Sequence, residues 1–207
     1  AALAALGGGG GAALAAAAPA PAAPPPPPAP VCAKFGAAQT EICAESRTFN
    51  SKLDHFDYAS TARWPHRYLY NDEQWGKLSP LGNGCPGPIL LYTGNEGPIS
   101  AFWGSNGFMI QHLAPTWGAM LLFPEERYYG TSLPFGAASF EAANVKYLTT
   151  EQILEDYVEL VDHIKSTVPK AANCPVLAFG GSYGGTLTTF LRAKYPATVI
   201  GGLAASA

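Results

Sequence analysis

The chain has 207 residues, of which 12 are Lys or Arg and 15 are Asp or Glu, so its formal net charge is −3. This slightly acidic composition, without a basic stripe, excludes nucleic acid and anionic membranes as expected partners. The four cysteines form no C-x-x-C pair and have no histidines at zinc-ligand spacing, so we expect neither a structural metal nor a cofactor. No run of about 18 strongly apolar residues follows residue 30, so no membrane-spanning helix is expected.

Residues 1–45 are expected to be a disordered leader and linker. Ala and Gly dominate residues 1–18, and a Pro-rich run occupies residues 19–30. Two interpretations stay open: the remnant of a secretory signal peptide, or a low-complexity linker that the prolines make stiff and extended. The folded domain is therefore predicted to span residues 46–207.

The remaining sequence alternates between predicted strands and helices. The first two strands are rich in aromatic and β-branched residues, and later ones are short apolar runs typical of strands buried on both faces. A strong helix begins after Thr149, with Gln152 as its capping-box partner. The predicted strands are Thr48–Leu53, Arg63–Asp72, Pro88–Tyr92, Gly118–Phe123, Pro175–Phe179 and Val199–Ala205, and the predicted helices are Asn106–Ala114, 149–168 and Tyr183–Tyr195. This alternation predicts an α/β fold with a mostly parallel sheet.

One motif carries the chemistry. Gly180-x-Ser182-x-Gly184 fits G-x-S-x-G, with an apolar strand running into it and a helix following it. This is the arrangement of a nucleophile elbow, whose strained turn exposes the serine hydroxyl above the sheet edge. Gly180 and Gly184, two residues either side of Ser182, are expected where strand and helix crowd together, and Gly181 and Gly185 are the other glycines of the elbow. The alternative is a Gly-rich tight turn with a solvated serine.

A serine nucleophile needs an oxyanion hole. One expected donor is the backbone N–H of Tyr183, at the start of the helix. A second is expected from the loop Thr93–Pro98, which follows an earlier strand at the same sheet edge. We favour Asn95 or Glu96 as its source, with Gly97 part of the same oxyanion or substrate loop; a simple polar turn is the alternative.

The loop after the next strand is also charged and aromatic. Its residues Glu126, Arg127 and Tyr128 are candidates to line a substrate cleft. The favoured interpretation of Arg127, however, is a structural ion pair with one of the loop's two glutamates.

The general base of a serine hydrolase is missing from this sequence. In α/β-hydrolases the triad follows the order Ser, acid, His, yet none of the 25 residues after Ser182 is Asp, Glu or His. His55, His66, His112 and His163 are most simply packing or surface residues. We therefore expect the first part of a longer catalytic domain, an incomplete α/β-hydrolase core truncated in about the sixth strand.

Several blocks occur in a fixed order over about residues 49–207. They are Leu53–Phe56, Arg67–Leu69, Gly94–Gly97, Glu126–Gly130, Ser132–Gly136, Tyr147–Thr149, Gly180–Gly185 and Leu203–Ala207. Together they resemble the proline-specific serine peptidases, the family of lysosomal Pro-X carboxypeptidase and its dipeptidyl peptidase relative. Two residues depart from the pattern: the family commonly has His where this chain has Glu126, and Gln where it has His66.

The resemblance implies a serine exopeptidase that cleaves peptides beside proline through an acyl-enzyme on Ser182. The triad Asp and His would lie beyond residue 207, so the chain alone is expected to be inactive. It also implies a helical cap and residence in the secretory pathway, the lysosome or vacuole, or outside the cell. The alternatives are an esterase or lipase on the same fold, or a non-catalytic fragment. Carboxypeptidase or dipeptidyl peptidase specificity stays open, as does the oligomeric state, with a homodimer among the options.

The cysteines add a test of strand order. If the usual order of this fold holds, Cys85 and Cys174 precede neighbouring strands, and a disulfide between them is compatible with that geometry. Cys32–Cys43 is a second candidate pair, and free buried thiols are the alternative.

Overall fold

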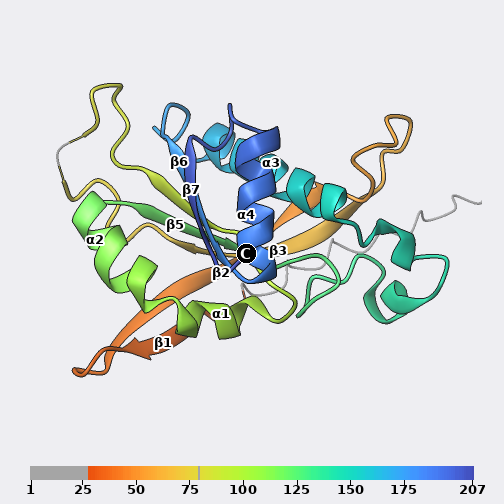
Figure 1. Cartoon of the computed structure of the whole chain (residues 1–207), viewed down its shortest axis with the longest axis horizontal. Helices are drawn as coiled ribbons and strands as arrows, with labels where there is room; N and C mark the ends of the chain where they lie inside the picture. The colour runs from red at the N-terminus through yellow and green to blue at the C-terminus, as the bar shows by residue number, and fades with distance from the viewer. Residues whose placement is uncertain (1–27, 79) are drawn as a thin grey trace, which may run out of the picture.

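The computed structural model describes residues 28–78 and 80–207. Seven strands form one sheet in the order β1-β2-β3-β5-β4-β6-β7 (Figure 1). The neighbours β5, β4, β6 and β7 run parallel, whereas β1, β2, β3 and β5 pair antiparallel in turn. The sheet is therefore mixed, and the expected parallel arrangement holds for its C-terminal half. The strands are β1 Val31–Phe35, β2 Thr40–Lys52, β3 Arg63–Asn71, β4 Ile89–Tyr92, β5 Met120–Pro124, β6 Val176–Gly181 and β7 Gly201–Ala205.

Helices cover both faces of this sheet because its central strands are apolar throughout. Alternate residues of β4 point to opposite sides. Ile89 and Leu91 join the core that contains residues of α3 and α4, and Leu90 and Tyr92 join the core that contains residues of α1 and the following turn. The helices are α1 Ile99–Ser105, a π-helical turn Phe108–Leu113, α2 Ala114–Trp117, two 3₁₀ turns at Gly136–Phe140 and Val145–Tyr147, α3 Thr150–Thr167 and α4 Tyr183–Lys194.

The N-terminal boundary expected at residue 45 was wrong. Residues 31–45 form β1 and the first part of β2, paired antiparallel, and β1 lies beside α1 (Figure 1). Phe35 and Ala44 are buried in the same core as Trp103. A disulfide joins Cys32 to Cys43 directly across the hairpin, so this short ribbon is fixed by both packing and a covalent link. The expected leader over residues 1–27 lies outside the described residues.

Two helical predictions also need correction. The expected helix Asn106–Ala114 is a π-helical turn that continues into α2, because Pro115 occupies the first turn of α2, where proline is tolerated. At α3, Thr149 caps the helix as predicted, accepting a hydrogen bond from Gln152 N at 3.3 Å. The Gln152 side chain does not return to the cap, since it donates to Asp54 Oδ1 at 2.6 Å and accepts from His55 N at 2.9 Å.

Both candidate disulfides are formed. Cys85–Cys174 links the segments that enter β4 and β6, the neighbouring strands on which that expectation depended. Cys32, Glu41 and Cys43 also cluster, but both sulfurs there belong to the disulfide and are not free to bind a metal. Within the described residues, no helix is both long and apolar enough to cross a membrane.

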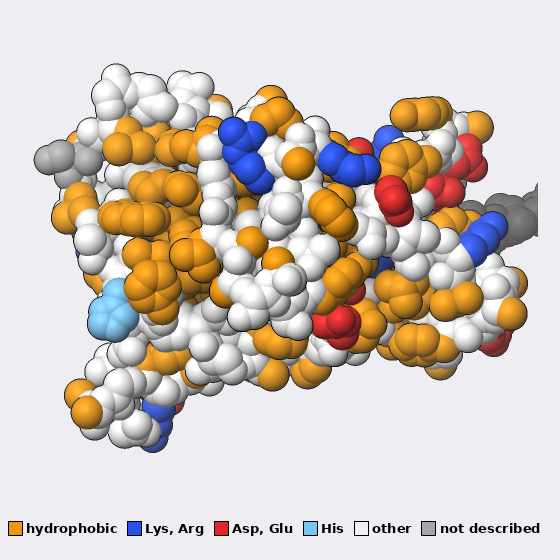
Figure 2. Space-filling view, in the orientation of Figure 1, with side chains coloured by type: hydrophobic (Ala, Val, Ile, Leu, Met, Phe, Trp, Pro, Cys, Tyr) orange, Lys and Arg blue, Asp and Glu red, His pale blue; other side chains and the backbone are white. Residues whose placement is uncertain are grey.

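The surface carries no dominant charge on the face that Figure 2 presents. Lys and Arg side chains are scattered there, and hydrophobic side chains gather over α2 on the left of the view.

The fold is an α/β-hydrolase core. Its parallel strands β4, β5 and β6 end at one edge, so the segments that follow Tyr92, Pro124 and Gly181 meet there.

Candidate active site

Ser182 occupies a strained turn between β6 and α4. Its backbone has φ 55° and ψ −125°, a conformation that costs a residue other than glycine about 1–3 kcal/mol. Two hydrogen bonds hold the turn: Ser182 N donates to Ala205 O on β7 at 3.0 Å, and Thr186 N donates to Ser182 O at 3.1 Å. The side chain itself is exposed. The turn thus has the backbone of a nucleophile elbow.

Three of the four glycines around Ser182 are needed for close packing. A Cβ on Gly180 would lie 2.2 Å from Gly184 O, one on Gly184 would lie 2.3 Å from Gly94 O, and one on Gly185 would lie 2.9 Å from Ala205 O. Gly181 differs, because its nearest neighbour would be 3.9 Å away. Crowding therefore explains Gly180 and Gly184, the two positions where it was expected, and Gly185 as well, but not Gly181.

The loop after β4 is hydrogen-bonded to the elbow. Asn95 Oδ1 accepts from Gly184 N at 2.9 Å, and Asn95 Nδ2 donates to Gly181 O at 3.1 Å. The buried Thr93 hydroxyl lies 2.7 Å from Gly184 O, and Tyr157 of α3 donates to Thr93 O at 2.7 Å. The Asn95 side chain is thus a positioning group that joins the two loops.

The backbone of this loop narrows the choice of a second oxyanion donor. Gly97 N donates to Asn95 O at 2.7 Å, so its N–H is engaged within the loop. Asn95 and Glu96 therefore remain the candidates for this role. Glu96 is exposed, at the same sheet edge as Tyr183.

Arg127 forms the expected structural ion pair, but with a different partner. Its Nε donates to Asp156 Oδ2 at 2.6 Å and its Nη2 to Asp156 Oδ1 at 2.7 Å, both groups being fully buried. The guanidinium also donates to three carbonyl oxygens, those of Lys52, Leu53 and Tyr147. The partner is an aspartate of α3 and not a glutamate of the loop, and Arg127 does not line a cleft.

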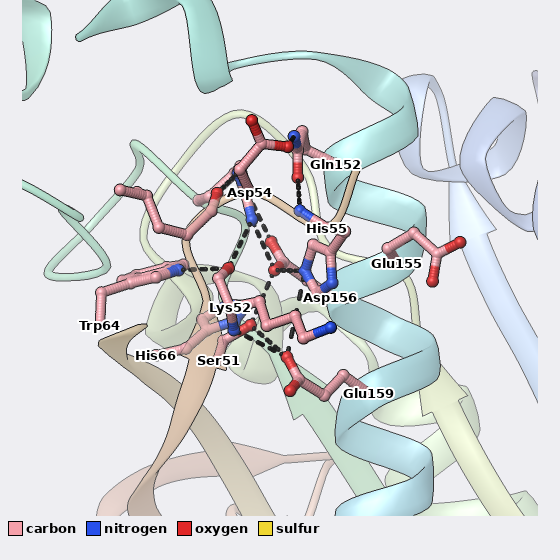
Figure 3. A network of polar contacts seen from close by, with 12 residues as sticks. Ser51, Lys52, Asp54, His55, Trp64, His66, Gln152, Glu155, Asp156 and Glu159 are labelled. Atoms are coloured by element: carbon pink, nitrogen blue, oxygen red, sulfur yellow. Dashed lines mark hydrogen bonds and ion pairs between the residues drawn. The ribbon is translucent and has the colours of Figure 1, made fainter. Parts of the chain in front are cut away.

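Figure 3 shows the network around Asp156. Ser51 Oγ and His55 Nε2 each lie 2.9 Å from Asp156 Oδ1. Burial alone would favour the neutral acid, but the charge of Arg127 and these hydrogen bonds hold the pKa of Asp156 well below its ordinary value. Asp156 therefore ties β2, the loop after β5 and α3 together as an ionised group.

The two glutamates of the loop after β5 have opposite environments. Glu125 is fully buried and accepts hydrogen bonds from Ile99 N, Thr131 N and Ser132 Oγ at 2.9–3.1 Å. Glu126 is only 1% exposed, yet its Oε2 has no hydrogen-bond partner among the described residues. Burial, together with the charges of Glu96 and Asp156, raises the pKa of Glu126 to about 8.

Glu126 alone among the three predicted cleft residues lines a pocket beside the elbow. The pocket has a volume of about 440 Å³. Tyr128, by contrast, is buried and donates its hydroxyl hydrogen bond to Asn144 O. The pocket is lined by Glu96, Glu126, Tyr129, Leu148, Thr149, Thr150, Glu151, Ile153 and Tyr183.

Comparison with known proteins assigns the family. Residues 51–207 match the family model described as serine carboxypeptidase S28. The chain belongs to this family. It is 49% identical over 160 residues to "Lysosomal Pro-X carboxypeptidase" of Homo sapiens, covering 77% of this chain and 31% of that protein. It is 42% identical over 166 residues to "Putative serine protease pcp-1" of Caenorhabditis elegans, covering 76% of this chain and 27% of that protein. The chain thus spans less than a third of these relatives.

Among solved structures, one match is Pyrococcus horikoshii acylaminoacyl peptidase. Its TM-score is 0.48 at 13% sequence identity, and the match covers 78% of this chain and 23% of that one.

The histidines of this S28 chain lie in packing or surface positions, as expected. His66 is fully buried and stacks on Trp64 at 4.5 Å and on Phe49 at 5.3 Å, between ring centroids, and His163 stacks on Phe49 as well. His55 belongs to the Asp156 network and His112 is exposed. No hydrogen bond joins a histidine to Ser182 within residues 28–78 and 80–207.

Sequence reasoning missed several residues that build this site in the S28 chain. Thr93 and Tyr157 hold the loop after β4, and neither stands out in the sequence. Asp156 had a signal: with Gln152 it forms an i, i+4 polar pair, and both lie on the buried side of an otherwise apolar helix face. A charged residue at such a position is rarely buried without a partner.

Proposed function

We propose that the protein is a serine peptidase whose nucleophile is Ser182. The observation that carries this proposal is the strained, exposed Ser182 at the β6–α4 turn of a chain that belongs to the S28 family. Ser182 Oγ attacks the carbonyl carbon of the scissile peptide bond and forms an acyl-enzyme, which water then hydrolyses. The Tyr183 N–H and a second N–H, from Asn95 or Glu96, stabilise the oxyanion of the tetrahedral intermediate.

The remaining catalytic groups are proposed to come from residues beyond this chain in the whole protein. A general base must take the Ser182 proton and deliver it to the leaving amine. Residues 183–207 contain no Asp, Glu or His, and the histidines before Ser182 lie in packing or surface positions. An acid and a histidine that follow residue 207 would complete the triad in its usual order for this fold.

We propose peptides as substrates, with exopeptidase cleavage beside proline. Support comes from the 49% identity to a relative whose name specifies a Pro-X carboxypeptidase. Residence in the secretory pathway or lysosome is supported by that relative's name and by two disulfides, which persist in oxidising compartments.

Active-site labelling tests the nucleophile. A fluorophosphonate probe should label the whole protein, and Ser182→Ala should abolish labelling. Ser166→Ala, at an exposed serine of α3, is the matched control and should label normally. Persistent labelling of the Ser182→Ala protein would overturn the proposal. Turnover of a short acyl ester without turnover of a proline-containing peptide would favour the esterase alternative.

A further inference from the structure

Three glutamates line the pocket beside the elbow. Glu96 comes from the loop after β4, Glu126 from the loop after β5, and Glu151 from the first turn of α3. No Lys, Arg or His is among the residues that line it. The nearest basic group in sequence, Arg127, directs its guanidinium to Asp156 and backbone carbonyls. Among the described residues, the pocket therefore has three carboxyl groups and no lining cation to balance them.

Glu126 gives this pocket an unfilled hydrogen-bonding position. Glu126 is only 1% exposed, and its Oε2 has no partner within the described part of the chain. Buried polar atoms are nearly always hydrogen-bonded, and an unmet one costs about 1–3 kcal/mol. Glu125, the adjacent residue, meets this rule with at least three donors. A donor supplied by a ligand would complete Glu126 in the same way.

The pocket adjoins the proposed reaction centre. Tyr183, which follows Ser182, is one of its walls, and Glu96 belongs to the loop proposed to donate to the oxyanion. Glu126 packs against that same loop, because its Cβ lies 3.6 Å from the position that a Cβ on Gly94 would take. A peptide bound at Ser182 can therefore place a neighbouring group in this pocket.

We propose that this pocket is a subsite for a protonated amine of the peptide substrate, with Glu126 as the group that anchors it. The inference rests on the proposed peptidase function and adds a specificity to it. An ammonium group has three N–H donors, which suits a pocket lined by three glutamates. Burial raises the pKa of Glu126 to about 8 in the empty pocket, and a bound cation would favour its ionised form. The amine can be the α-amino group or a lysine side chain.

Four tripeptides separate these two sources. Each has proline in the middle and phenylalanine last, with either lysine or norleucine first, and each is offered with a free or an acetylated amino terminus. With the whole protein, the best cationic peptide should exceed acetyl-norleucine-Pro-Phe in kcat/KM by about tenfold, the value of one charge-assisted hydrogen bond. Loss of the advantage on acetylation identifies the α-amino group, and loss with norleucine identifies the side chain.

Variants test the anchor. Glu126→Gln should remove most of the preference for the cationic peptide, measured as a ratio within the same preparation, and Glu126→His should remove all of it. Glu141→Gln, at an exposed glutamate that does not line the pocket, should keep the full ratio. If Glu126→Gln fails to fold, Glu96→Gln takes its place, with a smaller drop expected.

The inference is overturned if the unmodified protein turns over all four peptides equally. It is also overturned if Glu126→Gln lowers charged and neutral peptides by the same factor. Both results would leave the peptidase function intact. Absence of both peptide turnover and fluorophosphonate labelling is a different result, which removes the proposed function and this inference with it.

Discussion

Two neighbouring regions at the carboxyl ends of the strands differ in whether their buried charged side chains have hydrogen-bond partners. In the Arg127–Asp156 network, the guanidinium makes two hydrogen bonds to the carboxylate and three to backbone carbonyls. In the pocket one residue away, Glu126 is as deeply buried but has an oxygen without a partner among the described residues. The hydrogen bonds of the first region suit a structural role. The unpaired oxygen of the second suits the ligand-binding role proposed above.

The contrast explains why the loop after β5 contains three consecutive charged residues. Glu125 points toward Ile99 and Thr131 and fixes the loop, while Arg127 points toward α3 and attaches the loop to it. Glu125 and Arg127 hold the loop on either side of Glu126. Glu126 therefore stays buried although its own contacts do not stabilise it there. The partnered charges thus supply the rigidity that an unpartnered one requires.

The largest effect on the free energy of unfolding is expected from breaking the Arg127–Asp156 ion pair. Asp156→Asn leaves the buried Arg127 charge without its counter-ion and should lower the free energy of unfolding by about 3–5 kcal/mol. Glu73→Gln is the control outside this network. Glu73 and its partner Lys77 are 61% and 55% exposed, so loss of this ion pair should cost less than about 1 kcal/mol. Denaturant unfolding with both disulfides intact measures the difference, and equal costs for the two variants would contradict the assignment.

A smaller effect is expected from the charge of Glu126. Its pKa is raised from 4.5 to about 8 by burial and by neighbouring carboxylates, so the folded state binds a proton that the unfolded state has released. Stability therefore falls as the pH rises from 4.5 to about 8 and levels off above that. Glu126→Gln cannot ionise and should lack this decline.

The measurement is the difference in unfolding free energy between Glu126→Gln and the unmodified protein, followed from pH 4.5 to 8.5. Taking the difference cancels the other titrating groups. We expect the variant to gain on the order of 2–4 kcal/mol relative to the unmodified protein across this range. A flat difference would show that Glu126 is already ionised in the folded protein over this pH range.

Local patterns predicted the parts of the fold that depend on neighbouring residues. β4 and β6 are continuous apolar runs because both faces are covered, and Ser182 lies between glycines that its turn requires. The partner of Arg127 could not be predicted in this way, because Asp156 lies 29 residues further along the chain.

The N-terminal hairpin was missed for a different reason. β1 is the five-residue strand VCAKF, which follows a Pro-rich run and shows little alternation. It is held by a disulfide across the hairpin and by packing against α1, and both depend on the tertiary structure. The environment of Glu126 could not be predicted from local patterns either, because Glu125 and Glu126 look equivalent in the sequence.

The smallest effect on stability is expected at the elbow. Two of its glycines differ in whether a Cβ atom would have room. A Cβ on Gly184 would meet the backbone oxygen of Gly94 at 2.3 Å, whereas one on Gly181 would have no neighbour closer than 3.9 Å. Gly184→Ala should therefore push the loop after β4 away from the elbow at a cost of about 1–3 kcal/mol. Gly181→Ala should change stability by less than about 0.5 kcal/mol. Because Gly184 N also holds Asn95, fluorophosphonate labelling of Ser182 should slow in the first variant and not in the second. Equal labelling rates would mean that the reactivity of Ser182 does not depend on how closely the two loops are joined.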